Sequence, residues 1–479
     1  MINILNELVL KVNDFIWTYI LIAMLIVLGV YFTVKTNFVQ FRYFKEMFKL
    51  LGDGASKKSD KEDGKISSFQ AFCISTASRV GTGNIAGIAI AVVAGGPGAI
   101  FWMWLIALIG SASGFVESTL AQIYKVKDGN AYRGGPAYYI EQGLNKKWLG
   151  ITFSVLITIC FAFVFNAVQA NTITAAFNNA FNIPRFGFGI LIAVATALVI
   201  FGGSDRIAKV SEVIVPVLAV LYIAVSLFVM AINITELPNI IILIFTNALD
   251  FRSMSMGTMG GMILVGVKRG LFSNEAGMGS APNAAATAEV SHPVKQGLIQ
   301  ALGVFVDTLI ICSCTAFVVL LYPGYSTSTA QGIELTQEAL AYHIGPVGNI
   351  FIAVCILLFA FSSIVGNYYY GQSNIEFMSN KKSTMTIFRV VVIGFVLFGS
   401  VAQIDIVWNL ADVFMGLMAI INLIAIALLG KYAFAALKDY QEQRKAGIAN
   451  PVFDASTIEG LENVTAWKNE DDETIVENM

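Results

Sequence analysis

Two short polar segments interrupt long apolar stretches of this sequence. Residues 77–84 have the sequence ASRVGTGN, and residues 269–277 have the sequence RGLFSNEAG. Glycine permits an unwound backbone and the close approach of a bound group. A helix that breaks at such a point exposes N–H groups on one side and carbonyl groups on the other, which favour an anion and a cation respectively. These segments can therefore bind a zwitterion without a dedicated charged side chain.

The residues of these two breaks are the first candidates for ligand binding. They are Ser78, Gly81, Thr82, Gly83, Asn84, Phe272, Ser273, Asn274 and Gly277. The alternative is that small residues here only allow tight packing between membrane helices. Packing does not require Arg79, Asn84, Asn274 or Glu275, so we favour binding.

Five of the ionisable side chains within apolar stretches, where a charge is costly and indicates a function, are candidates for a structural or coupling role. They are Arg79, Glu117, Glu275, Asp307 and Asp412. We expect Arg79 and Glu275 to pair with charged neighbours and hold the unwound segments together rather than contact the ligand. Glu117 is expected to pair with a Lys or Arg, structurally or as an inner gate, and a role in ion coupling is the alternative. Asp307 and Asp412 either carry Na⁺ or protons or form hydrogen bonds between helices.

The elements that must position these residues are membrane-spanning helices. Of the 479 residues, 56% are hydrophobic and 13% are charged, which is about half the charged fraction of soluble domains. Apolar segments of roughly 17–25 residues are long enough to cross a bilayer. We place eleven spans, at residues 15–34, 67–93, 97–124, 147–177, 186–203, 207–233, 256–289, 294–322, 346–377, 384–401 and 407–436. All five cysteines fall inside these spans, which argues against a disulfide framework.

The Lys and Arg residues indicate the orientation. If the N-terminus is outside, 24 of the 30 lie in inside loops or at inner helix ends, three lie outside and three lie within spans. Positive residues concentrate on the cytoplasmic side of membrane proteins. We therefore expect an all-α multi-pass protein of a plasma membrane, with its N-terminus outside and its C-terminus in the cytoplasm. The net charge of −2 implies no nucleic-acid partner.

The positions of the two breaks predict an internal symmetry. If the first span is set aside, the breaks fall in the first and sixth of ten core helices. Two halves of five helices have opposite orientations, which is the inverted-repeat arrangement of secondary transporters. We predict repeats at residues 67–233 and 256–436. They are preceded by an extra span, an interfacial helix and a loop at residues 1–66. An acidic cytoplasmic tail follows at residues 437–479, with little order from residue 440 on.

Three motifs resemble those of the alanine or glycine:cation symporter family, whose members have a LeuT-like fold. They are residues 78–84 (SRVGTGN), residues 269–277 (RGLFSNEAG) and residues 306–308 (VDT). The second motif is highly specific, whereas the third is weak by itself. The resemblance covers residues 15–436. It implies Na⁺- or H⁺-coupled uptake of small neutral amino acids by prokaryotes.

The resemblance also implies roles for particular residues. The expected Na⁺ ligands are carbonyl and hydroxyl groups of Ala77, Val80, Ser362 and Ser363. The third core helix lines the substrate site in this fold, so Gln169 would hydrogen-bond the substrate and Phe165 would cap it. Packing is the alternative for both. Asn367 is expected to face the same cavity.

We therefore predict a Na⁺-coupled symporter that imports alanine, glycine or a similarly small neutral amino acid by alternating access. A proton-coupled carrier of the same fold is the alternative, although neither His292 nor His343 lies within a span. A channel or a non-transporting receptor would be a different class of membrane protein. The two breaks in inverted positions argue against both. We expect no cofactor besides the coupling Na⁺, and no nucleotide loop or nucleophile indicates an enzyme. The expected partners are the amino acid, Na⁺ and the bilayer, while the oligomeric state is left open.

Overall fold

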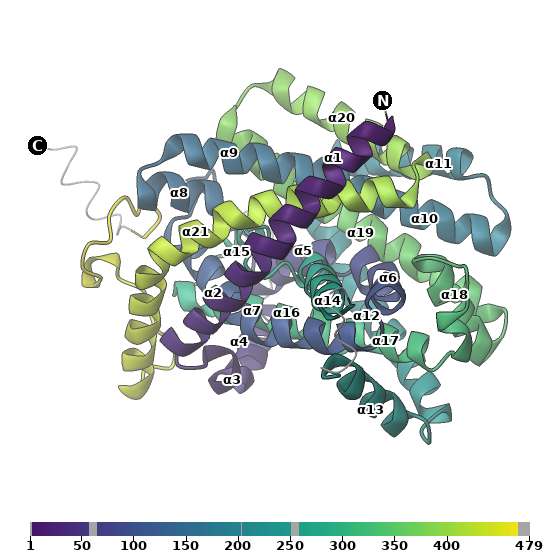
Figure 1. Ribbon diagram of the computed structural model, residues 1–479. Coiled ribbons are helices and arrows are strands. Elements are labelled where there is room, and N and C mark those ends of the chain that lie inside the picture. Colours follow the sequence, from purple (N-terminus) through teal and green to yellow (C-terminus); the bar gives the residue numbers. More distant parts are fainter. Residues whose placement is uncertain (1, 57–64, 203, 251–257, 468–479) are drawn as a thin grey trace, which may run out of the picture.

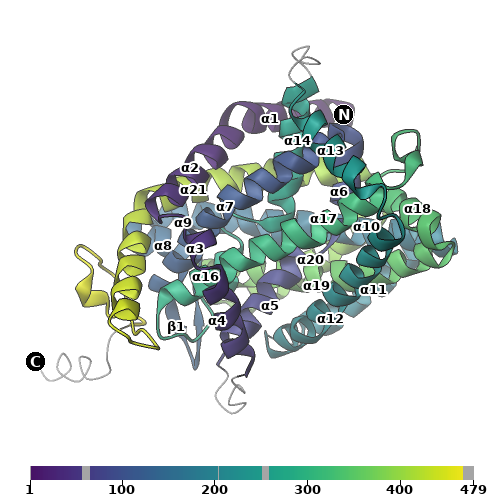
Figure 2. The same cartoon turned by 90° about the horizontal axis from the view of Figure 1, so that it is seen from below.

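The computed structural model describes residues 2–56, 65–202, 204–250 and 258–467, and these residues form a bundle of helices (Figures 1 and 2). The N-terminal part is one long helix that packs along the C-terminal helix α21 (Ile404–Lys445), as Figure 1 shows. Its elements and the short helices after it are α1 (Ile2–Phe15), the wide π-helical segment η1 (Ile16–Leu21), α2 (Ile22–Lys35), α3 (Val39–Arg42) and α4 (Phe44–Ser56).

The next part of the chain begins with a helix that breaks in its middle. The axis bends by 50° between α5 (Ser68–Arg79) and the helix at residues 83–95. A capping box formed by Ser67 and Gln70 satisfies the first N–H groups of α5. The elements that follow α5 are η2 (Gly83–Gly87), α6 (Ile88–Gly95), α7 (Gly98–Ile123), the antiparallel strands β1 (Val126–Asp128) and β2 (Ala131–Arg133), α8 (Pro136–Leu144), α9 (Lys147–Ile157), η3 (Thr158–Phe165), α10 (Asn166–Phe181), α11 (Arg185–Ile200) and α12 (Ser204–Ile232).

The last part contains the second break. Helix α14 (Thr258–Asn274) ends within the polar segment, and the chain becomes helical again only at α15 (Ala281–Ala285). The other elements of this part are α13 (Leu237–Ala248), α16 (Pro293–Phe305), η4 (Val306–Cys312), α17 (Ser313–Leu320), η5 (Pro323–Ser326), α18 (Ile333–Ile344), α19 (Val347–Met378), α20 (Lys382–Val401), α21 and η6 (Ala455–Thr457).

The helices agree with a multi-pass membrane protein. Every predicted span coincides with helical residues over most of its described length. Among the described residues, seven helices are long and apolar enough to cross a membrane, or up to nine if each of two bent pairs is one span. Helix α11 has 16 residues and is shorter than these. The count of eleven spans and the inverted repeat therefore stay predictions.

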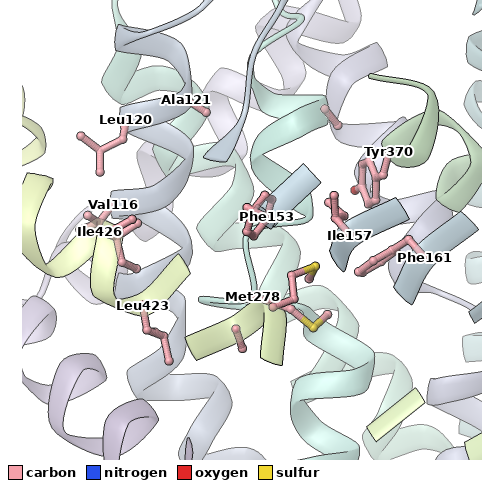
Figure 3. Packing of buried hydrophobic residues seen from close by; sticks show 14 of the residues in the cluster. Val116, Leu120, Ala121, Phe153, Ile157, Phe161, Met278, Tyr370, Leu423 and Ile426 are labelled. Carbon is pink, nitrogen blue, oxygen red and sulfur yellow. The ribbon is translucent and has the colours of Figure 1, made fainter. Parts of the chain in front are cut away.

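The largest apolar cluster includes residues of α7, α21 and the second break. Figure 3 shows Val116 and Leu120 of α7 beside Leu423 and Ile426 of α21, with Met278 of the break in the same cluster. All five side chains are buried. Lipid is as apolar as these side chains, so close packing stabilises such contacts more than transfer from water does. The cluster holds α7 and α21 against the unwound segment.

The C-terminal segment folds back onto the end of α7. Trp467 Nε1 donates a hydrogen bond to the carbonyl of Gln122 at 2.9 Å, and the N–H of Phe453 donates to the carbonyl of Ser291 at 2.9 Å. Helix α21 itself continues to Lys445. The expectation of little order from residue 440 on is therefore wrong up to residue 467, because aromatic residues anchor this segment. Residues 468–479 lie outside the described residues.

Candidate functional site

The break after α5 is shaped by side chains that bind its backbone. Val80 adopts an extended conformation that ends the helix. The N–H of Gly81 donates to Asn84 Oδ1 at 2.9 Å, and the N–H of Thr82 donates to Gln169 Oε1 at 3.0 Å. Two N–H groups at the break therefore already have side-chain acceptors. The Thr82 hydroxyl is fully buried and has no hydrogen-bond partner among the described residues.

The break after α14 depends on residues with left-handed backbone conformations and on a carboxylate from α7. Glu275, Gly277 and Gly279 have φ values of 59°, 80° and 85°. Glu117 accepts hydrogen bonds from the N–H groups of Gly277 and Gly279, both at 3.0 Å, and from Asn422 Nδ2 at 2.8 Å. These bonds replace those that the helix loses at the break. Within the described chain, no Lys or Arg lies within ion-pair distance of Glu117, contrary to expectation.

Asp307 joins the two breaks. Its Oδ1 accepts from Asn84 Nδ2 at 2.6 Å, and its Oδ2 accepts from Ser273 Oγ at 2.7 Å and from Thr308 Oγ1 at 3.1 Å. Asn274 Nδ2 donates to Thr308 Oγ1 at 3.2 Å. The network is buried and links η2, α14 and η4. In this structure Asp307 therefore forms hydrogen bonds between helices, which was one of its two predicted roles.

A second buried polar cluster links α5, the second break and α19. Ser78 Oγ lies 2.8 Å from Glu275 Oε1 and 2.7 Å from Asn367 Oδ1. Ser280 Oγ donates to Glu275 Oε2 at 2.6 Å, and Asn367 Nδ2 donates to Asn166 Oδ1 at 3.1 Å. Glu275 therefore contacts hydroxyl groups rather than a basic side chain.

An aromatic row lies beside the break after α5. The rings of Phe165 and Phe272 are 4.4 Å apart, and those of Phe272 and Trp408 are 4.7 Å apart. A Cβ atom at Gly83 would lie 2.8 Å from Phe272 Cδ1, so the backbone can approach this ring only because residue 83 is glycine. A side chain at residue 83 would therefore collide with this row.

Oxygen atoms suited to a cation also lie close to this break. Ser363 Oγ lies 3.2 Å from the carbonyl oxygen of Val80 and donates to the carbonyl of Phe359 at 3.0 Å. A Cβ atom at Gly81 would collide with Ser363 Oγ. The Ser362 hydroxyl bonds to the carbonyl of Phe359 at 2.7 Å on its own helix. Ala77, the fourth expected ligand, is buried near the end of α5. Hydroxyl and carbonyl oxygens are the ligands that hard cations prefer.

The remaining intramembrane charges differ in their surroundings. Asp412 pairs with Arg269, whose Nη2 is 2.5 Å from Oδ1 and 2.6 Å from Oδ2, and with Lys268 Nζ at 3.6 Å. Asp412 is thus held in a salt bridge between α14 and α21. Arg79 is 2% exposed, and among the described residues it donates only to the carbonyl of Gln300, at 3.4 Å. Its Nε and Nη2 have no hydrogen-bond partner in the part of the chain that the structure describes.

The structure brings most of the candidate residues together around the two breaks. Trp408 and Arg269 also belong to this region, with the guanidinium carbon of Arg269 4.5 Å from the Trp408 ring. Neither residue is among the candidates that the sequence analysis selects. A signal was available, because Trp408 and Asp412 are four residues apart and therefore share one helix face.

Comparisons with known proteins agree along the whole chain. The model of the sodium:alanine symporter family matches residues 2–455. The amino-acid carrier protein AlsT of Bacillus subtilis (strain 168) is 55% identical, over 98% of this chain and 99% of AlsT. The probable sodium/glutamine symporter GlnT of the same organism is 54% identical over 99% of both chains. The sodium/alanine symporter AgcS of Methanococcus maripaludis is 37% identical, over 92% of this chain and 98% of AgcS.

The fold is also similar to a solved structure. The crystal structure of MhsT in complex with L-phenylalanine has a TM-score of 0.52 and 17% identity, and it covers 78% of this chain and 96% of MhsT. At this identity the likeness shows a shared fold, which is of the LeuT type.

Proposed function

The chain belongs to the sodium:alanine symporter family, and we propose that it imports alanine or glycine together with Na⁺. Members of this family are transporters rather than enzymes. Import would proceed by alternating access, in which one helix bundle rocks against the other around a fixed site.

One observation carries the proposal: the break after α5 offers groups for a cation and for a carboxylate within one turn. The Val80 carbonyl faces the Ser363 hydroxyl at 3.2 Å. The next two residues present N–H groups, and the Thr82 hydroxyl has no partner among the described residues. A polar group buried without a partner costs free energy, so a bound ligand that accepts its hydrogen bond gains affinity. A Na⁺ ion and a substrate carboxylate at these positions would also attract each other.

Gln169 holds the place that we assign to the substrate carboxylate. Its Oε1 accepts from the N–H of Thr82 at 3.0 Å, in the way that a carboxylate oxygen would. Binding would therefore exchange one acceptor for another. The carboxylate is the stronger acceptor because it is charged. Gln169 would then be free to bond the substrate from the side.

Uptake into proteoliposomes tests the proposal. We expect the purified protein to accumulate radiolabelled alanine when Na⁺ is present outside and absent inside. Replacing external Na⁺ with choline should abolish accumulation, and a Na⁺ ionophore should dissipate it. Equal uptake in choline would refute Na⁺ coupling. Accumulation driven instead by an inward proton gradient would favour the proton-coupled alternative.

The substrate can be identified in the same vesicles. Unlabelled glycine should compete with labelled alanine, because we assign Phe165 and Phe272 to a wall that restricts the size of the substrate side chain. The relative GlnT is named for glutamine, so glutamine is the informative competitor. Stronger competition by glutamine than by glycine would show that the proposed substrate is wrong, even if Na⁺ coupling holds.

A further inference from the structure

A count of hydrogen atoms around Glu275 reveals a group that the proposed function does not use. Ser78 Oγ lies 2.8 Å from Glu275 Oε1 and 2.7 Å from Asn367 Oδ1. Both distances are typical of O–H···O hydrogen bonds. The serine hydroxyl carries one hydrogen, whereas a carboxylate oxygen and an amide oxygen carry none. One of the two short contacts therefore lacks a hydrogen unless a further proton is present.

Asn367 cannot supply the missing hydrogen. Its Nδ2 donates to Asn166 Oδ1 at 3.1 Å, and Asn166 Nδ2 donates to the carbonyl of Ala162 at 3.0 Å. A backbone carbonyl only accepts, so it determines the orientation of the Asn166 amide. The Asn166 amide in turn determines that of Asn367. The oxygen of Asn367 consequently faces Ser78.

We propose that Glu275 binds an exchangeable proton on Oε1. The acid then donates to Ser78 Oγ, and the Ser78 hydroxyl donates to Asn367 Oδ1, so both short contacts contain a hydrogen. The other oxygen, Oε2, accepts from Ser280 Oγ at 2.6 Å. The proton thereby connects the break after α14 to both α5 and α19.

Two other buried carboxyl groups of this region, Glu117 and Asp307, need no such proton. Each oxygen of Glu117 and of Asp307 accepts a hydrogen bond from a group that has a hydrogen to give. The donors are Gly277, Gly279 and Asn422 for Glu117, and Asn84, Ser273 and Thr308 for Asp307. Charge-assisted bonds of this kind stabilise a buried carboxylate. Of these three groups, only Glu275 has a short contact without a donor.

The surroundings of Glu275 do not neutralise it by direct contact. No ion pair within 4.0 Å joins Glu275 to a Lys or Arg side chain in the described structure. The titratable groups on the elements packed around it are Arg79 (α5), Glu117 (α7), Cys160 (η3), Asp307 (η4) and Tyr370 (α19). A neutral acid at this position avoids the cost of a buried charge without a contact partner.

Under the proposed function, on which this step rests, the proton is a second coupling ion. When it leaves, the carboxylate and Asn367 Oδ1 compete for one hydroxyl hydrogen, and the contact between the break and α19 weakens. Closure of the helices around the substrate is then linked to proton binding. By linkage, substrate binding must raise the affinity for the proton by the same factor.

Infrared spectroscopy of the purified protein tests the proton independently of transport. We expect the C=O band of a buried carboxylic acid, which shifts in D₂O and disappears in Glu275→Gln. The new amide can donate to Ser78 and accept from Ser280, so the variant should fold. Glu442→Gln is the control, because the Glu442 side chain is 64% exposed and lies far from both breaks in the sequence. The proposal is overturned if the wild type shows no such band or if the band survives in Glu275→Gln.

Proton uptake during binding gives a second test that does not depend on one variant. Calorimetry of alanine binding in buffers of different ionisation enthalpy should show an uptake of about one proton by the wild type at alkaline pH. Both Glu275→Gln and Ser78→Ala should show none. The affinity of Glu275→Gln for alanine should also be independent of pH. Absence of uptake by the wild type, or unchanged uptake in both variants, would overturn the coupling role.

These two tests separate the inference from the proposed function. If the wild type binds no alanine at any pH, the proposed substrate is wrong while the infrared result still decides whether Glu275 is protonated. If added Na⁺ removes the carboxylic-acid band, a sodium ion rather than a proton occupies the position, and the inference is wrong.

Discussion

At the residue scale, the most useful feature is the Thr82 hydroxyl, because it is buried without a partner in the described structure. The position of Thr82 between two glycines makes it a candidate from sequence, and the structure adds that its N–H is held by Gln169. Such a pairing joins residues far apart in the chain and cannot be inferred from spacing. The contact between Arg269 and Trp408 likewise joins distant parts of the chain, so the sequence does not pair these two residues.

Replacing Thr82 tests whether its hydroxyl forms a hydrogen bond with the bound ligand. Thr82→Val keeps the shape and removes a hydroxyl that bonds to nothing in the described structure, so the free protein should keep its thermal stability. Alanine binding should weaken by about 1–3 kcal/mol if the hydroxyl bonds to the carboxylate. Calorimetry with alanine measures this.

Arg79 is the rival partner for the carboxylate, because two of its nitrogens lack hydrogen-bond partners in the described structure. Comparing Arg79→Gln with Thr82→Val, using alanine and its amide analogue, separates the two. If Arg79→Gln alone erases the preference for the carboxylate, the assignment to the backbone around Thr82 is wrong.

The aromatic row makes a prediction about substrate size. Phe165→Ala removes the ring that packs on Phe272 at 4.4 Å and should admit larger substrates such as leucine. The loss of discrimination should be about 1–3 kcal/mol, as for other pockets that sense a methylene group. Competition against labelled alanine measures it. Phe398→Ala, at a ring that is 44% exposed on α20, should leave the substrate range unchanged. If Phe165→Ala does so as well, Phe165 is not part of the wall.

At the element scale, the two breaks were predictable and their supports were not. Glycines and amides at mid-span identify an unwound segment, because an apolar helix has no use for them. The support for the second break comes from Glu117 on α7, whose partners are backbone N–H groups instead of the expected basic side chain. The sequence shows that a buried carboxylate needs a hydrogen-bond partner. It does not show which one, because almost every residue type carries a backbone N–H group and such a donor leaves no signal in the sequence.

The salt bridge between α14 and α21 makes a prediction about stability. Asp412→Asn leaves Arg269 and Lys268 buried without their carboxylate, at distances that are now 2.5 and 3.6 Å. Removing one partner of a buried ion pair typically costs about 3–5 kcal/mol. We expect a clear drop in the unfolding midpoint in detergent. Asp405→Asn, at an exposed carboxylate at the start of the same helix, should cause no drop. Equal stability of the two variants would show that the ion pair contributes little.

At the scale of the whole molecule, the architecture could be predicted better than the details. Apolar length identifies helices that can cross a bilayer, and the shared fold with MhsT agrees with the LeuT-like expectation. The expectation for the tail fails because the tail, although acidic, contains apolar residues that anchor it: besides Trp467, they are Phe453, Ile458 and Val464, which are buried in the structure. An acidic segment with few apolar side chains becomes ordered when those side chains can be buried against a folded part of the protein.

The orientation in the membrane is a prediction for the intact molecule, because it rests on the distribution of Lys and Arg over all loops. The five native cysteines are buried, so single introduced cysteines can be labelled with little background. In right-side-out vesicles, a membrane-impermeant thiol reagent should label Ser326→Cys, in the loop after α17, without permeabilisation. Lys382→Cys, at the start of α20, should be labelled only after permeabilisation. Both positions are exposed in the structure, so access depends on the side of the membrane.

The opposite pattern of labelling would invert the topology. Labelling of both positions in sealed vesicles would mean that the number of spans between them is even, which would contradict the predicted span at residues 346–377.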